Sequence, residues 1–229
     1  MITLMASVFA LTLILGFPIA FCLGITSLAV LVAMDVPLHL IAQRIFTGID
    51  SFPLMAVPFF VLAGDIMNVG GTTARLISFA NVLVGKVRGG LAHTTVVSAM
   101  FLSGISGSAV ADASALGSVL IPGMVKQGYG KGFASALVAA AAVMGPIIPP
   151  SIFMVIMGVT TGVSIGGLFA AGVIPGILQC LTMMAMAYYF AVKHDYPRDP
   201  VPLTWRRVWK EFVSAGPALV APVIIIDGL

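Results

Sequence analysis

Two short breaks in long apolar runs hold the residues of this chain that are best suited to bind a ligand. The first covers residues 103–108, Ser-Gly-Ile-Ser-Gly-Ser, and the second covers residues 145–151, Gly-Pro-Ile-Ile-Pro-Pro-Ser. Serine hydroxyls and backbone carbonyls are oxygen ligands that suit a hard cation such as Na⁺, and glycine permits the turns between them. Small residues also allow close helix packing, but beside a Pro-broken partner we favour an ion site.

Asp112 lies one turn beyond the first break, inside an apolar segment. Two interpretations stay open: it attracts an ion or relays a proton, or it accepts hydrogen bonds at the positive start of its helix. Asp65 lies toward the end of another apolar segment, and we interpret it as an interfacial anchor. The candidate ion- and substrate-binding residues are Ser103, Gly104, Ser106, Gly107, Ser108, Asp112, Gly145, Pro146, Pro149, Pro150 and Ser151.

Catalysis is a poor explanation of these residues. The single glutamate, Glu211, is far from any pair of histidines, so a zinc protease motif is absent. Asp112 is the one deeply placed carboxylate, whereas an aspartyl protease needs two that approach each other. A serine nucleophile would need a buried histidine partner, and we assign His93 no role because it starts its segment close to water. The chain is therefore predicted not to be an enzyme.

The composition identifies an integral membrane protein. Of the 229 residues, 60% are hydrophobic and 8% are charged, and the mean hydropathy is +1.14, whereas soluble proteins carry about 25% charged residues. No Lys, Arg, Asp or Glu occurs in residues 1–34 or 132–192. The net charge of +3 is spread over the chain, which predicts neither nucleic-acid binding nor a polybasic lipid-binding tail.

The hydrophobic pattern predicts an all-α fold in the lipid bilayer. Residues 3–34 form one kinked span or two short helices, since Gly16 and Pro18 interrupt them. Apolar residues at helical spacing predict an interfacial helix and an in-plane arm. In chain order, we expect the interfacial helix at 35–50, a span at 52–69, the arm at 72–87, a re-entrant hairpin at 91–125, a Pro-broken helix at 131–161, a span at 166–192, a polar loop at 193–211 and a further apolar run from 212.

The cations of the loops predict how these segments are oriented. Each limb of the hairpin is expected to be too short to cross the bilayer, so the chain returns to the side from which it entered. This topology places the main groups of Lys and Arg in the cytoplasm. Both breaks are then reached from the cytoplasmic face after limbs of similar length, and we expect them to meet near the middle of the membrane. Where two such breaks face each other, the backbone carbonyls that end one half-helix can bind a cation, and the N–H groups that start the next can attract an anion.

The ordered set of motifs resembles the large membrane (M) subunit of tripartite ATP-independent periplasmic (TRAP) transporters. The motifs are the serine- and glycine-rich segment 102–112, Ile-Pro-Gly-Met at 121–124, Gly-Tyr-Gly-Lys-Gly-Phe-Ala at 128–134 and the proline-rich segment 145–151. Residues 53–64 and Arg-Gly-Gly-Leu at 88–91 are also similar. The resemblance runs along essentially the whole chain, and together the motifs are highly specific although each is weak alone.

The resemblance implies a secondary transporter of the bacterial inner membrane that is driven by a Na⁺ gradient and moves like an elevator. It implies two partners, a small membrane subunit and a periplasmic binding protein that delivers an organic acid such as a C4-dicarboxylate, sialic acid or a keto acid. One Na⁺ site is then formed by Ser103, Ser106 and Gly145, beside part of the substrate site. No other cofactor is expected.

The resemblance also implies a domain plan with one of two inverted repeats. Scaffold and arm helices would occupy 1–88, the transport-domain hairpin and broken helix 89–165, a membrane helix and cytoplasmic loop 166–211, and the start of the second repeat 212–229. We expect transport to need the second repeat from another chain. The alternative is a non-transporting scaffold or a truncated fragment that pairs with the small subunit, and a channel is disfavoured because no polar residues line a continuous pore.

Overall fold

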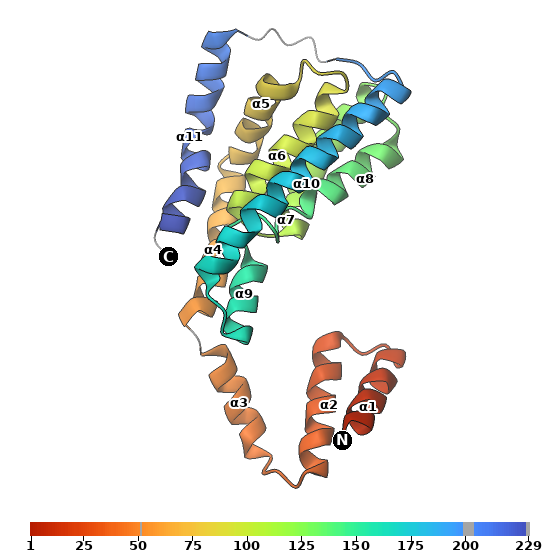
Figure 1. The fold of residues 1–229 in the computed structure, drawn as a ribbon, viewed down its shortest axis with the longest axis vertical. Helices are drawn as coiled ribbons and strands as arrows, with labels where there is room; N and C mark the ends of the chain where they lie inside the picture. Colours follow the sequence, from red (N-terminus) through yellow and green to blue (C-terminus); the bar gives the residue numbers. More distant parts are fainter. Residues whose placement is uncertain (51, 199–203, 228–229) are drawn as a thin grey trace. The chain divides into compact units, whose positions relative to one another are not determined.

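The computed structural model describes residues 1–50, 52–198 and 204–227, and its regular structure in these ranges is helical (Figure 1). The chain forms two compact units, Met1–Phe52 and Pro53–Leu229. In chain order the helices are α1 (Ile2–Ile14), α2 (Ile19–Ala33), α3 (His39–Ile49), α4 (Phe52–Val69), α5 (Thr72–Val84), α6 (Gly90–Ser106), α7 (Ala109–Lys126), α8 (Lys131–Ala142), α9 (Ile152–Thr161), α10 (Ile165–Lys193) and α11 (Trp205–Asp227). The predicted all-α class is confirmed.

The first unit shows that residues 3–34 form two helices rather than one kinked span. Gly16 adopts the left-handed conformation with φ of 81°, and Pro18 then caps the start of α2. Proline has no N–H to continue the ladder of α1, and glycine enters the left-handed region without the cost of a Cβ. The helices α1 and α2 pack against each other, and the predicted amphipathic helix follows as α3.

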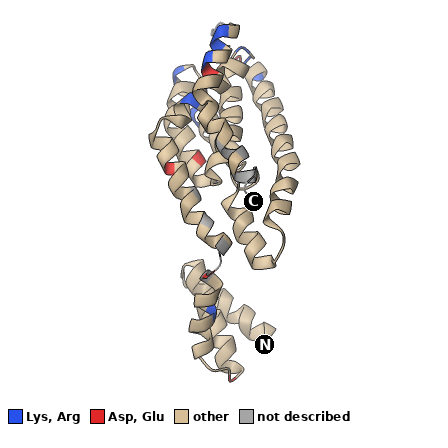
Figure 2. Cartoon of the chain, turned by 90° about the vertical axis from the view of Figure 1, so that its left-hand side faces the viewer, with Lys and Arg blue, Asp and Glu red and all other residues tan. Residues whose placement is uncertain are grey.

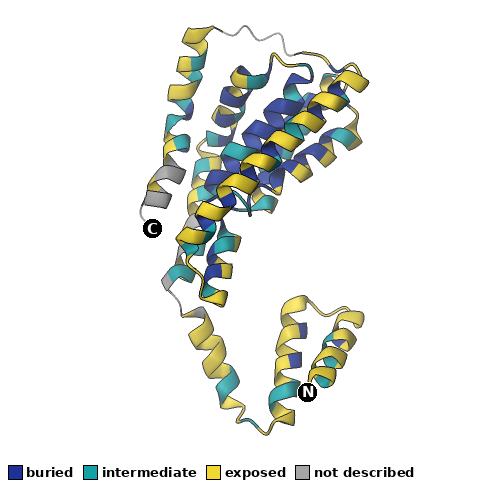
Figure 3. Ribbon diagram, viewed as in Figure 1, coloured by how far each residue is buried: buried dark blue, intermediate teal, exposed yellow. Residues whose placement is uncertain are grey.

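The second unit is built around α6, which is buried along most of its length (Figure 3). Helices α5, α7, α8 and α10 all contact α6, and their buried side chains form one apolar core. Most of the Lys and Arg residues of this unit gather toward one end of the bundle (Figure 2). The core holds α6 in a fixed place, and the far end of α6 is the first break.

Helix α5 is packed more closely than an in-plane arm would be. The sequence predicts that its apolar face lies on the membrane, but Leu76 and Phe79 are buried in the core and α5 contacts both α6 and α11. Phe79 stacks on Phe101 with ring centroids 5.7 Å apart and contacts Phe212 at 5.8 Å. Protein therefore covers the face that was expected to meet lipid, because neighbouring helices supply a larger apolar partner than the interface does.

One predicted boundary is wrong. Helix α11 begins at Trp205, so the predicted polar loop 193–211 is helical from there on. Trp209 and Phe212 are ring neighbours along α11, and the contact of Phe212 with Phe79 helps hold this part of α11 against α5. The second limb of the hairpin has the predicted bounds, since α7 covers Ala109–Lys126, but by length and composition α7 could cross a membrane, as could α10, whereas the sequence predicts a limb too short to do so. The predicted span at 166–192 is confirmed by α10.

The segment before α6 and the turn between α7 and α8, which together form the base of the hairpin, contact the residues that follow α10. Arg88, just before α6, forms an ion pair with Asp195, and the N–H of Gly89 donates to the carbonyl oxygen of Pro197 at 3.1 Å. The rings of Tyr129 and Tyr196 stack with centroids 4.1 Å apart, which ties the turn between α7 and α8 to the same segment. These contacts fix the end of the hairpin opposite the first break.

Candidate functional site

The first break is narrower than the sequence predicts. Ser103, Gly104 and Ser106 stay helical in α6, and the break is confined to Gly107 and Ser108. Gly107 ends α6 in the left-handed conformation with φ of 58°, and the hydroxyl of Ser108 accepts a hydrogen bond from the N–H of Ala111 at 3.4 Å. A glycine that ends one helix and a serine that caps the next need no longer linker.

The two breaks meet, as the sequence predicts. A Cβ at Gly107 would lie 2.8 Å from the carbonyl oxygen of Pro150 and 3.0 Å from the backbone nitrogen of Ile152. A Cβ at Gly145 would lie 2.9 Å from the carbonyl carbon of Ser108. Each break therefore rests on the backbone of the other, and glycine at positions 107 and 145 is what permits this approach.

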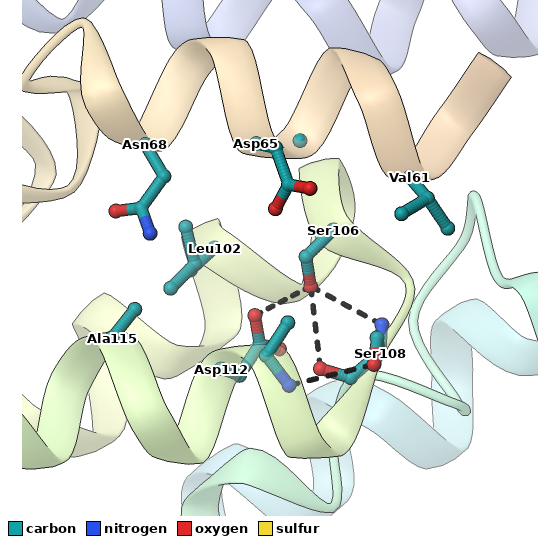
Figure 4. Close-up of a pocket in the computed structure, with 10 residues that line it drawn as sticks. Val61, Asp65, Asn68, Leu102, Ser106, Ser108, Asp112 and Ala115 are labelled. Carbon is teal, nitrogen blue, oxygen red and sulfur yellow. Dashed lines mark hydrogen bonds between the residues drawn. The ribbon is translucent and has the colours of Figure 1, made fainter. Parts of the chain in front are cut away.

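Asp112 lies at the centre of the contact between the breaks. Its side chain is fully buried, and its carboxylate accepts a hydrogen bond from the hydroxyl of Ser103 at 3.1 Å. It accepts a second from the hydroxyl of Ser106 at 2.5 Å (Figure 4). A Cβ at Gly145 would lie 3.0 Å from the same carboxylate. The three residues predicted to hold Na⁺ thus all adjoin Asp112. The donors to Asp112 are thus hydroxyls of α6, whereas one interpretation expected donors at the start of its own helix; attraction of an ion or relay of a proton stays a prediction.

Both helices that leave the breaks begin with a capping serine. Ser108 is the cap of α7, while Ser106 donates to Asp112 and accepts from the N–H of Ser108 at 3.2 Å. At the second break, the Ser151 hydroxyl caps α9 by accepting from the Met154 N–H at 3.3 Å and donates to the Pro146 carbonyl at 2.8 Å. The starts of α7 and α9 therefore both face the junction of the breaks, where an anionic group is favoured.

Small residues of α10 hold the second break in place. A Cβ at Gly172 would collide with the carbonyl oxygen of Ile147, and one at Gly176 would lie 2.5 Å from the side chain of Ile148. Such close approach of a helix to irregular backbone buries groups that would otherwise face lipid. Pro149 and Pro150 lie in this supported stretch between α8 and α9, as the predicted broken helix requires.

A pocket of about 80 Å³ opens between α4 and the first break. It is lined by Ser106, Ser108 and Asp112 of the hairpin and by Asp65 and Asn68 of α4 (Figure 4). Asp65 points toward Ser106 across the pocket. Oxygen atoms from two elements thus converge on one cavity.

Asp65 is the residue whose place the sequence analysis missed. The interpretation as an interfacial anchor considered its depth alone, whereas the structure places it opposite the first break. Helix α4 approaches the first break at Gly64, where a Cβ would be in van der Waals contact with the Cα of Ser106 at 3.7 Å. The signal in the sequence was the spacing of Asp65 and Asn68, which puts two polar side chains on one face of an otherwise apolar helix.

Comparison with known proteins gives the family. The sequence profile of the tripartite ATP-independent periplasmic transporter, DctM component, matches residues 6–229. The chain belongs to this family.

Several TRAP permeases are similar to it. The chain is 42% identical over 222 residues to the isethionate TRAP transporter permease protein DctMQ of Oleidesulfovibrio alaskensis, which covers 96% of this chain and 35% of that protein. It is 42% identical over 215 residues to the sialic acid TRAP transporter large permease protein SiaM of Vibrio cholerae, covering 93% of this chain and 50% of SiaM. It is 40% identical over 219 residues to the C4-dicarboxylate TRAP transporter large permease protein DctM of Vibrio cholerae, covering 95% and 48%.

The chain spans about half the length, or less, of these curated relatives. Membership in this family and the apolar helices together indicate a multi-pass membrane protein, and its bacterial relatives are consistent with a location in the inner membrane. The relatives are permeases and not enzymes, which agrees with the absence of a catalytic motif in the sequence.

Proposed function

We propose that the chain forms part of the permease of a TRAP transporter that imports an organic acid together with Na⁺. The observation that carries the proposal is the junction of the two breaks around Asp112, where buried hydroxyls, a carboxylate and two helix starts converge. The names of its relatives support the substrate class, since they specify isethionate, sialic acid and C4-dicarboxylates, all of them organic acids.

In this proposal, Asp112 prepares the serines to bind the ion. The hydroxyls of Ser103 and Ser106 donate hydrogen bonds to the carboxylate, so the lone pairs of their oxygens point away from it and can bind a cation. The backbone carbonyl of Gly145 would complete the set of oxygen ligands. The negative charge of Asp112 offsets the positive charge of Na⁺, which reduces the cost of holding the ion away from water.

The acid of the substrate would meet the starts of α7 and α9. Helix starts attract anions because their first N–H groups have no partner within the helix, and both helices begin at the junction. A cation bound beside them adds a second attraction for the substrate. Ion and substrate would thus each favour the binding of the other, which is the coupling that a symporter requires.

The complete transporter, in this proposal, contains more than this chain. A small membrane subunit and a periplasmic binding protein would join it, and a second inverted repeat would supply the other half of the substrate site. The hairpin and the broken helix, residues 89–165, would move as an elevator against the scaffold and arm helices of residues 1–88. Membership in a permease family favours this function over the non-transporting scaffold or truncated fragment.

Substitution of one serine tests the proposal. Ser106→Leu removes a hydroxyl beside Asp112, and we expect it to abolish Na⁺-dependent uptake by proteoliposomes that contain the complete transporter and its binding protein. Ser118→Leu is the matched control because Ser118 is exposed on α7 and its hydroxyl donates to the carbonyl of Ala115 within the same helix. Unchanged uptake by Ser106→Leu, with normal membrane insertion, would contradict the proposal.

A further inference from the structure

The start of α11 carries three cations within residues 206–210. Arg206, Arg207 and Lys210 line an open hollow of about 460 Å³ together with Thr204 and Glu211. In the part of the chain that the structure describes, these cations form no ion pair, and the pair that does form joins Arg88 to Asp195. The hollow therefore carries an excess of positive charge.

Two tryptophans stand beside these cations. Trp205 and Trp209 are one turn apart on α11, and they are 79% and 58% exposed. The next aromatic residue, Phe212, contacts both Trp209 and Phe79 of α5, so this part of α11 is held against the bundle. Large rings with a polar N–H are favoured where hydrocarbon meets lipid headgroups, and exposure to bulk water would leave their apolar surface uncovered.

We propose that the start of α11, residues 205–210, binds the headgroup phosphate of an anionic phospholipid. The guanidinium groups of Arg206 and Arg207 can each hold two phosphate oxygens, and Lys210 adds a third charge. The positive end of the α11 dipole adds to the attraction. Trp205 and Trp209 then lie against the glycerol and upper acyl chains of the same lipid.

The pattern favours a lipid over free phosphate. Free phosphate would use the cations but would leave both exposed rings in water, whereas a phospholipid covers them. Three cations are too few for a polybasic tail. What the structure adds is their grouping within residues 206–210 at the start of α11, beside the rings and at the end of the bundle where Lys and Arg gather (Figure 2).

The chain offers a direct probe of this site, because Trp205 and Trp209 are its only two tryptophans. Bromine atoms on acyl chains quench tryptophan fluorescence on contact. We would reconstitute the chain in phosphatidylcholine vesicles at physiological ionic strength and replace a rising fraction of lipid by brominated phosphatidylglycerol or, in parallel, by brominated phosphatidylcholine. We expect phosphatidylglycerol to reach half-maximal quenching at a mole fraction at least tenfold lower.

Neutral variants identify the cations responsible. Each Lys or Arg near an anionic headgroup contributes roughly a fivefold preference, so the combined substitution Arg206→Gln, Arg207→Gln and Lys210→Gln should remove most of the selectivity. The matched control is Lys86→Gln, Lys126→Gln and Lys131→Gln, which removes the same charge from exposed positions elsewhere and should leave the selectivity intact. Circular dichroism confirms that each variant is folded.

Three outcomes would overturn the proposal. The first is equal quenching by the two brominated lipids in the unaltered chain, and the second is an equal loss of selectivity in both triple variants. The third is loss of selectivity when inorganic phosphate is added at constant ionic strength, which would mean that the hollow takes free phosphate. None of these outcomes depends on transport, so the proposed function is tested separately.

Discussion

The contact between the breaks predicts that Gly107→Ala is much more damaging than an alanine at an equivalent glycine elsewhere. An L-residue in the left-handed conformation costs about 1 kcal/mol. The new Cβ would also lie 2.8 Å from the carbonyl oxygen of Pro150, on backbone that cannot turn away. Forcing an extra carbon into packed surroundings costs about 1–3 kcal/mol more. We therefore expect Gly107→Ala to lower the free energy of unfolding by about 2–4 kcal/mol.

Gly162 provides the matched control for this prediction. It ends α9 with φ of 72° and ψ of 14°, close to the 58° and 13° of Gly107, but a Cβ there would have no atom within 4 Å. Gly162→Ala should therefore cost only the conformational part, about 1 kcal/mol. Unfolding in mixed micelles by titration with sodium dodecyl sulfate measures both variants. Equal losses in the two variants would refute the contact between the breaks.

Three further substitutions test the other parts of the site. Asp112→Asn keeps the size of the side chain but removes its charge. The free energy of Na⁺ binding should weaken by at least about 2 kcal/mol, roughly thirtyfold in affinity. An unchanged affinity would show that the hydroxyls of Ser103 and Ser106 bind the ion without the charge of Asp112. Asp65→Asn acts from an exposed position across the pocket and should weaken Na⁺ binding only two- to fivefold, so a loss as large as that of Asp112→Asn would contradict its peripheral role. Ser151→Ala removes the cap of α9 and should lower the unfolding free energy by about 1 kcal/mol in the same titration, whereas no change would mean that the cap contributes nothing.

The sequence predicts well the features that depend on local chemistry. Long apolar runs identify the helices, and the prolines at 146, 149 and 150 cannot sit within a regular helix, so the broken helix is placed correctly between α8 and α9. The meeting of the breaks also follows, because it needs only limbs of similar length that start from one face. The choice between one and two helices in residues 3–34 depends on the left-handed turn at Gly16 before Pro18, and the hydrophobic pattern does not distinguish such a turn from a kink.

Features that depend on distant partners were missed or misplaced. Ser103 and Ser106 have low helix propensity beside glycine, which suggested a six-residue break, but burial against the core and bonds to Asp112 keep them helical. Asp65 was interpreted from its depth in its own segment, and its position depends on how α4 packs against the hairpin. The start of α11 was placed too late because the cations of residues 205–210 look like a polar loop along the chain, whereas the contact of Phe212 with Phe79 of α5 holds the following turn against the bundle.

Direct measurement of Na⁺ binding tests the central claim, that the two breaks close into one ion site. Radioactive ²²Na⁺ binding to the purified chain can be followed by scintillation proximity, with folded Gly107→Ala and Gly162→Ala proteins in parallel. We expect saturable binding, which Gly107→Ala should weaken at least tenfold and Gly162→Ala should leave unchanged. Absence of saturable binding, or the same affinity in all three proteins, would contradict it.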